Sequence, residues 1–178
     1  MIPFGLSTMV GAPAISSEWS EVYTHPTFAS NTGGVGYRTY RQVFAGSVFA
    51  YNSTKVRVTF KASTTAGHDL YTVGASIVEQ GTGANGAATP TQLKFAGATA
   101  KQITANTEAT SDDTDFVIDT TKNYLIILDL GSSTNNQLYD AANTLYYANS
   151  SPSYLTQNVT GYTTGTYRFI ISKIEVYH

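Results

Sequence analysis

Cysteine is absent from this chain of 178 residues, and charged residues make up only 12% of it. Without thiols the protein cannot form disulfides, thiolate metal sites or a cysteine nucleophile. Its stability must therefore come from core packing, from oligomerisation, or from both. Because charge is scarce compared with the roughly 25% that is usual in soluble domains, the polar surface must be supplied by 27 Thr, 16 Ser, 10 Asn and 15 Gly residues.

Basic residues are few and dispersed. Ten basic and twelve acidic residues give a net charge of −2. The only loose basic group spreads over 24 residues and consists of Arg38, Arg41, Lys55, Arg57 and Lys61. A protein that binds DNA or RNA usually concentrates such residues in a patch or stripe, because its affinity comes from neutralising phosphates. We therefore expect no nucleic acid among the partners.

Long apolar runs are also missing. No stretch approaches the roughly 20 consecutive apolar residues that a membrane-spanning helix requires, so no membrane partner is expected. Residues 2–15 are mildly apolar, but they include Pro3 and Pro13 and have no basic segment at their start, which does not match a secretory signal peptide. Because the chain begins at Met1, we expect it to be a complete gene product.

The sequence also lacks helical periodicity. No window of eleven or more residues keeps apolar residues at i, i+3, i+4 and i+7, and residues 135–143 could hold one helical turn at most. Residues 55–61 alternate strictly instead, with Val56, Val58 and Phe60 on one face, which is the pattern of a half-buried strand. Further strands are expected at residues 70–79, 92–95, 101–104, 115–119, 124–130 and 167–177.

Short strands separated by turn residues indicate an all-β fold, an antiparallel β-sandwich. Residues 124–130 are apolar except for Asp129, so we expect a central strand that is buried on both faces. Gly74 is a candidate bulge or close-approach point within its strand. The predicted core consists of Val56, Val58, Phe60, Phe116, Ile118, Leu125, Ile127, Phe169 and Ile171.

We expect one domain preceded by an arm. Residues 1–34 contain several Pro and Gly residues and only short apolar pieces. This composition predicts an extended N-terminal arm for attachment or oligomerisation, with a short strand near residues 19–23 as its one regular element. Residues 35–178 are assigned to the sandwich, because neither an internal repeat nor a linker interrupts them.

No motif in the sequence specifies a reaction. The three histidines, His25, His68 and His178, are scattered and do not have the spacing of a metal site. The Gly-x-Ser-x-Gly elbow of many hydrolases is absent, and nothing selects a Ser-His-Asp triad from the many candidates. We therefore expect no enzymatic activity, no cofactor and no bound metal.

A cluster of carboxylates allows two interpretations. Asp112, Asp113, Asp115 and Asp119 occupy near-alternating positions, as ligands of a calcium loop do, but the Gly and closing Glu of the twelve-residue calcium loop are missing. Alternatively, the cluster forms a solvated turn whose charges discourage pairing between sheet edges.

Asp129 is a second acidic feature that requires an explanation. An unpaired charge inside an apolar strand is energetically costly. The side chain must therefore face solvent, line a pocket, or pair with a base such as Arg57 or Arg168.

Tyrosine supplies the strongest binding signal. Five tyrosines fall within 24 residues, among Asn, Ser, Thr, Gln and Gly: Tyr139, Tyr146, Tyr147, Tyr154 and Tyr162. Flat rings stack on the C–H faces of sugars, and Tyr and Asn dominate adaptable binding loops, so these residues are the candidate ligand-binding site. The alternative is that they fill the rim of the sandwich or a subunit contact, since Tyr is a strong strand former.

The closing segment, residues 165–177 (GTYRFIISKIEVY), resembles the last strand of jelly-roll modules of the galactose-binding-like type. Residues 56–60 and 116–126 resemble the same class, and the similarity extends over residues 38–177. It implies a jelly roll in which the final strand lies beside the first. No metal or sugar ligand of that family can be transferred to a residue here.

The composition as a whole is similar to that of surface proteins of tailed phages, such as head decorations, fibres and receptor-binding tips. This similarity implies a non-enzymatic structural protein that decorates or projects from the virion surface and contacts host glycans. It also implies a homo-oligomer, with three copies as the expected number, attached to other virion proteins through the arm. The alternative is a carbohydrate-binding module that acts as an adhesion or receptor-binding domain.

Overall fold

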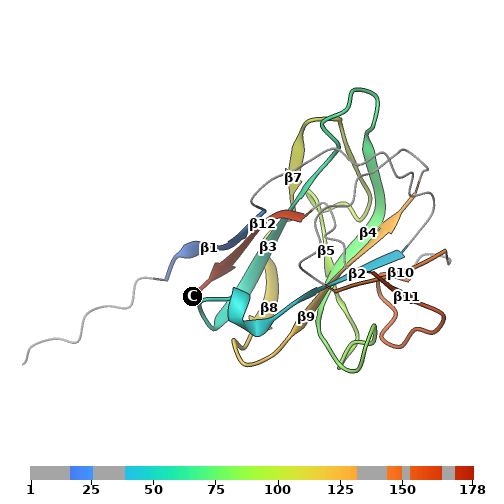
Figure 1. The fold of residues 1–178 in the computed structure, drawn as a ribbon. Helices are drawn as coiled ribbons and strands as arrows, with labels where there is room; N and C mark the ends of the chain where they lie inside the picture. Colours follow the sequence, from blue (N-terminus) through green and yellow to red (C-terminus); the bar gives the residue numbers. More distant parts are fainter. Residues whose placement is uncertain (1–16, 26–38, 132–143, 150–152, 166–170) are drawn as a thin grey trace, which may run out of the picture.

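The computed structural model describes residues 17–25, 39–131, 144–149, 153–165 and 171–178. These residues form twelve strands and one short 3-10 helix, η1 (Gly46–Val48). The strands make two antiparallel sheets that pack face to face, one on the left and one on the right of Figure 1. The prediction of an all-β antiparallel sandwich is confirmed.

Sheet A contains five strands: β1 (Trp19–Thr24), β3 (Ser53–Lys61), β7 (Glu108–Thr110), β8 (Thr114–Ile118) and β12 (Ile171–Tyr177). Their order is β1-β12-β3-β7, and β8 also pairs with β3. The long strand β3 can hold both short strands on one side because β8 pairs with its first half and β7 with its last three residues.

Sheet B contains seven strands: β2 (Thr39–Phe44), β4 (Leu70–Glu79), β5 (Thr91–Leu93), β6 (Lys101–Ile103), β9 (Tyr124–Leu130), β10 (Leu145–Ala148) and β11 (Thr163–Gly165). Their order is β11-β10-β2-β9-β4-β5, and β6 also pairs with β4. The central strand β9 is the most apolar one, and it is hydrogen-bonded to β2 on one side and β4 on the other.

The main core lies between the two sheets. The alternation of β3 places Val56, Val58 and Phe60 in this core, and Ile118 and Ile171 are buried there as predicted. Phe116 is only half-buried but packs against the same core, while the predicted core residue Phe169 lies outside the described residues. Strand periodicity therefore identifies most of the inward-facing positions.

A second apolar cluster lies on the outer face of sheet B. It contains Leu125 and Ile127 of β9 together with Val78 of β4. Alternate residues of β9, such as Ile126 and Leu128, point into the main core instead. The prediction that this strand is buried on both faces is confirmed, and the outer face of sheet B must therefore be covered by another part of the chain.

Residues 17–25 fall inside the predicted arm, and the structure places them in the sandwich. The strand expected near residues 19–23 is present as β1, which pairs with the closing strand β12. Val22 and Tyr23 pack against the main core. The boundary between arm and sandwich at residue 34 lies outside the described residues, and the jelly-roll assignment stays a prediction.

Candidate functional site

The structure separates the predicted tyrosine cluster. Tyr139 lies outside the described residues. Tyr146 and Tyr147 are neighbours on β10, so strand alternation points them to opposite faces of sheet B. Tyr147 packs against the main core, with its ring centroid 6.5 Å from that of Tyr40, whereas Tyr146 packs against the outer cluster. The two residues therefore cannot form one binding surface.

Residues 153–162, which we call the tyrosine loop, cover the outer face of sheet B. Tyr154 packs against the outer cluster beside Tyr146. Its ring lies directly over Gly74 of β4, where a Cβ atom would overlap the ring. The pairing of β4 with β9 shifts register between Thr72 and Gly74, so the prediction of a bulge or close approach at Gly74 is confirmed on both counts.

Asp129 anchors the start of the tyrosine loop. It lies on β9, points to the outer face of sheet B, and is only 1% exposed. Its Oδ2 atom accepts hydrogen bonds from the backbone N–H groups of Ser153 and Tyr154, the latter at 2.8 Å. The carboxylate thus satisfies two backbone donors that would otherwise be left without partners.

Arg41 joins the tyrosine loop to a second loop. It lies on β2, directly opposite Tyr146 in the register with β10, and is fully buried. Its Nη2 atom donates to the carbonyl oxygens of Ser153 at 3.1 Å and Thr156 at 2.6 Å. Its Nη1 atom donates to the carbonyl oxygen of Ala84 at 2.9 Å. The planar guanidinium suits this role because its several donors point in fixed directions.

Burial has the largest effect on the pKa of Asp129. Loss of solvent raises the pKa of Asp129 above its usual value of 3.8, while the Thr39 hydroxyl, the two loop N–H groups and the charge of Arg41 oppose that rise. Arg41 is therefore the base that accompanies Asp129. Arg57, one of the two partners that the sequence suggested, lies on sheet A beside Asp113, and Arg168 lies outside the described residues.

Further hydrogen bonds hold the rest of the tyrosine loop. The Tyr162 hydroxyl pairs with Ser153 Oγ at 2.8 Å, and the Tyr162 ring lies 5.5 Å from the Arg41 guanidinium carbon. The N–H of Val159 donates to Asn85 Oδ1 at 2.8 Å. These contacts leave Tyr146, Tyr154 and Tyr162 half-buried, and Leu155 is 43% exposed. The loop thus presents aromatic edges and one apolar side chain on a fixed backbone.

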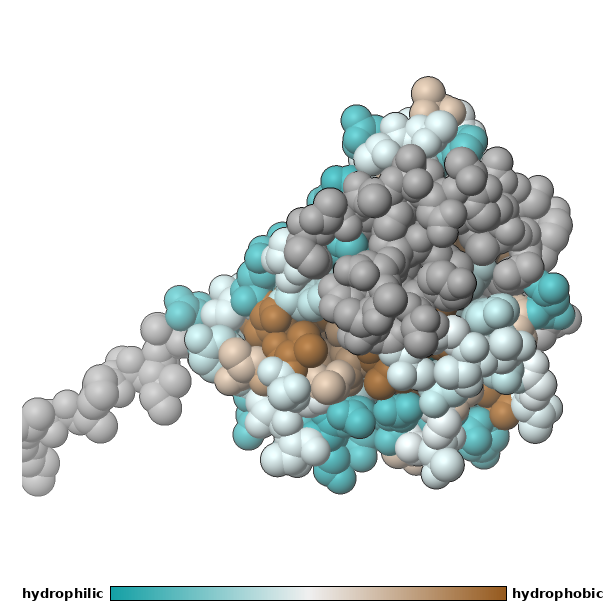
Figure 2. All heavy atoms as spheres, in the orientation of Figure 1, coloured by the Kyte–Doolittle hydropathy of each residue, from teal (hydrophilic) through white to brown (hydrophobic). Residues whose placement is uncertain are grey.

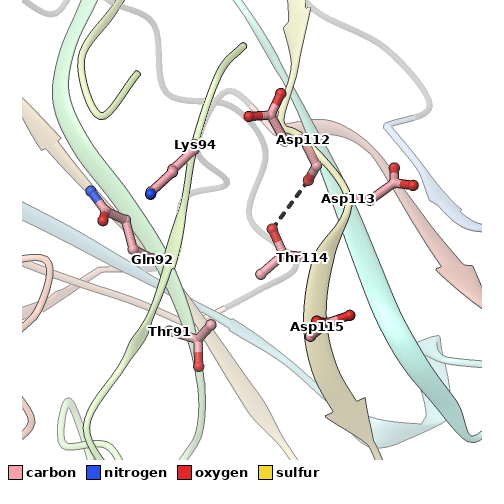
Figure 3. A pocket seen from close by; sticks show the side chains of 7 residues that line it. All are labelled: Thr91, Gln92, Lys94, Asp112, Asp113, Thr114 and Asp115. Atoms are coloured by element: carbon pink, nitrogen blue, oxygen red, sulfur yellow. Dashed lines mark hydrogen bonds between the residues drawn. The ribbon is translucent and has the colours of Figure 1, made fainter. Parts of the chain in front are cut away.

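Three of the four clustered carboxylates, those of Asp112, Asp113 and Asp115, line a groove of about 340 Å³ between β5 and β8. Figure 3 shows Gln92 and Lys94 on one wall and the aspartates on the other. The two carboxylate oxygens of Asp112 accept the N–H groups of Ala96 and Gly97, each at 2.7 Å. Asp112 therefore stabilises the turn at residues 95–98, in which Ala96 and Gly97 both have positive φ.

The other carboxylates of the cluster also have protein partners. Asp113 lies 3.5 Å from Arg57, and Asp115 lies 3.7 Å from Lys55. Asp119 accepts the N–H and hydroxyl of Thr121, and these bonds lower its pKa. Within the described ranges, no three His, Cys, Asp or Glu residues come together as a possible metal site. Asp112 and Asp119 therefore stabilise turns, while Asp113 and Asp115 lie in ion pairs.

The histidines occupy separate places. The His178 ring stacks on Tyr51 at 3.8 Å, and its Nε2 atom lies 2.9 Å from Ser20 Oγ. This is a serine–histidine pair that the sequence did not reveal, because the two residues are 158 positions apart. Among the described residues, the side-chain hydrogen bond of this imidazole is the one to Ser20.

Two comparisons with known proteins were negative. No protein-family model matches the chain, and no curated protein matches it. In the part of the chain that the structure describes, no helix has the length and apolar character needed to cross a membrane.

Proposed function

We propose that the chain is a non-enzymatic structural protein of a tailed-phage particle, which decorates or projects from the virion surface and makes contacts through the tyrosine loop. The observation that supports this proposal best is the way in which two buried charged side chains, Arg41 and Asp129, hold the loop on sheet B. A binding loop that is already ordered loses less conformational entropy when it meets its partner.

The chemistry of the loop suits recognition rather than catalysis. Tyr154 and Tyr162 supply rigid, amphipathic contact area with few rotatable bonds, as tyrosines do in antibody binding loops. The exposed Leu155 adds an apolar contact at the surface. On the face seen in Figure 2, the coloured residues are mainly hydrophilic or neutral, with a few hydrophobic areas among them.

The proposal includes a homo-oligomer of three copies and attachment to other virion proteins through the arm predicted at residues 1–34, without residues 17–25, which belong to the sandwich. Its support is the low charge of the chain, since a surface with 12% charged residues has little electrostatic repulsion to keep copies apart. Burying aromatic and apolar side chains such as Tyr146 and Leu155 between copies would contribute roughly 25 cal/mol per Å² before the cost of association.

A carbohydrate-binding module is the second candidate function. The same half-buried rings, flanked by the hydroxyls of Ser153 and Thr156, could stack on a sugar and hydrogen-bond to it. In that case the tyrosine loop contacts a host glycan, and the protein need not be part of a particle.

Particle association separates the two functions. Antibodies against the chain should label purified phage particles from the culture that carries this gene, and the protein should copurify with particles at a fixed ratio to the capsid protein. Absence from the particle fraction, together with saturable glycan binding that Tyr162→Ser removes and Tyr51→Ser does not, would favour the carbohydrate-binding module. Tyr51 is a matched control because it is an exposed tyrosine outside the loop.

A further inference from the structure

The outer face of sheet A carries a pair of aromatic rings that the tyrosine loop does not use. Trp19 of β1 and Tyr177 of β12 are direct partners in the sheet register, and Tyr177 is in turn the partner of Lys55 on β3. Register partners share one face of a sheet, so both rings lie on the side opposite the main core. Their centroids are 5.6 Å apart and their planes are tilted by 54°.

Arg57 holds the tryptophan ring in place. Its guanidinium carbon lies 3.7 Å from the centroid of the Trp19 ring, which is the geometry of a cation–π contact. Its Nε atom also lies 3.5 Å from Asp113. One face of the indole is therefore covered by a paired cation, and the ring as a whole remains partly exposed. A ring that is already oriented is a ready stacking surface.

Most of the charges on this face are matched. Four ion pairs lie on it, each with one basic and one acidic side chain: Lys55–Asp115, Arg57–Asp113, Lys61–Glu108 and Lys173–Glu175. The pairs cancel, and Glu21, the register partner of Glu175, adds one carboxylate, so the face offers little attraction to nucleic acid or anionic lipid. A hydrophobic protein partner is also disfavoured, because the centre of a protein interface is depleted in charged residues.

We propose that the outer face of sheet A binds a neutral saccharide, which stacks its C–H surface on Trp19. Tyr177 flanks the sugar, and the paired side chains of Arg57 and Asp113 hydrogen-bond to its hydroxyl groups. Aromatic rings combined with a few oriented polar groups are the usual composition of such a site. Sheet A and sheet B lie on opposite sides of the sandwich (Figure 1), so this site does not depend on the tyrosine loop or on the proposed function.

The single tryptophan of the chain makes the proposal directly measurable. We would titrate the purified full-length protein with three neutral hexasaccharides, cellohexaose, maltohexaose and mannohexaose, and screen it on an array of neutral glycans. We expect a saturable change in tryptophan emission with at least one neutral glycan, and no change with polyphosphate. The proposal is overturned if no neutral glycan gives saturable binding up to on the order of 10 mM, where only weak affinities remain.

Variants locate the sugar. Trp19→Ala should abolish binding measured by calorimetry, Trp19→Phe should retain it with about tenfold lower affinity because a smaller ring remains, and Tyr177→Ser should weaken it. Tyr162→Ser, on the opposite sheet, should bind as the unaltered protein does. Binding that survives in Trp19→Ala, or that Tyr162→Ser removes, would place the sugar elsewhere and contradict the proposal. Trp19→Phe separates loss of the ring from misfolding. It should keep the circular-dichroism spectrum of the unaltered protein and a ring on which the sugar can stack.

Discussion

Asp129 in the middle of sheet B holds the backbone of Tyr154, 25 positions later in the chain, through an N–H···O bond of 2.8 Å. A buried carboxylate in the most apolar strand thus serves as the attachment point for a loop. The ring of the same Tyr154 covers Gly74 on the neighbouring strand. The main chain and the side chain of Tyr154 are therefore fixed by two adjacent strands, β9 and β4.

Gly74→Ala should destabilise the fold and displace the tyrosine loop. A Cβ atom at this position would overlap the Tyr154 ring, and overpacking of this kind costs about 1–3 kcal/mol. The free energy of unfolding, measured with urea, should fall by that amount.

A double-mutant cycle tests the cause. In a Tyr154→Ala background the ring is gone, so Gly74→Ala should cost less than it does in the unaltered protein. Equal costs in both backgrounds would show that the glycine is needed for its backbone conformation and not for the ring.

Arg41→Lys should loosen the tyrosine loop even though the charge is retained. A single ammonium group cannot reach the carbonyls of Ala84, Ser153 and Thr156 together, whereas the guanidinium does. We expect a loss of about 2 kcal/mol, and a larger loss for Arg41→Ala, which also leaves Asp129 without its neighbouring cation. Hydrogen exchange should show faster exchange at Val159 and Gly86, while amides of β3 stay protected.

Asp129→Asn should change the pH dependence of stability. Because burial raises the pKa of Asp129 above 3.8, the folded state binds this proton more tightly than the unfolded state does. The ionised carboxylate therefore costs stability above the raised pKa, and that cost disappears as the pH falls through it. Relative to Asp129→Asn, which cannot titrate, the free energy of unfolding of the unaltered protein should rise between pH 7 and pH 4.

Comparing the unaltered protein with Asp129→Asn cancels the contributions that other titrating groups make to the pH dependence of stability. The pKa values of Asp69 and Asp119 are lowered by hydrogen bonds, so they act in the opposite direction, but both residues are present in both proteins. A difference between the two proteins that stays constant over this pH range would contradict the assignment.

Tyr146→Ser tests the oligomer. If copies meet through the outer face of sheet B, this change should lower the association constant at least tenfold in analytical ultracentrifugation, which corresponds to about 1.4 kcal/mol. Tyr147→Ser is the comparison, because Tyr147 packs against the main core and should lower thermal stability without a specific effect on association. An oligomer that withstands Tyr146→Ser, or a protein that is monomeric from the outset, would refute the interface.

The sequence alone determined the sandwich class, the alternation of β3, and the burial of β9 on both faces, because these features depend on residues within one strand. It also singled out Asp129 and Gly74, since a charge and a glycine stand out in apolar strands. It did not delimit β2, and it did not find β7, β10 or β11, which are three or four residues long and, in β7 and β11, mainly polar. Short strands of this kind form because longer neighbours offer them hydrogen-bond partners.

Only the tertiary structure decided which residues meet. Arg41 became the companion of Asp129, and Trp19 came to lie beside Tyr177, through pairing of strands that are 80 or more positions apart. Strand alternation predicts that Tyr146 and Tyr147 point to opposite faces of the sheet, whereas their proximity in the sequence suggests a single binding site. Local periodicity determines which way a side chain points, whereas its neighbours are set by strand order and register, which depend on the whole chain at once.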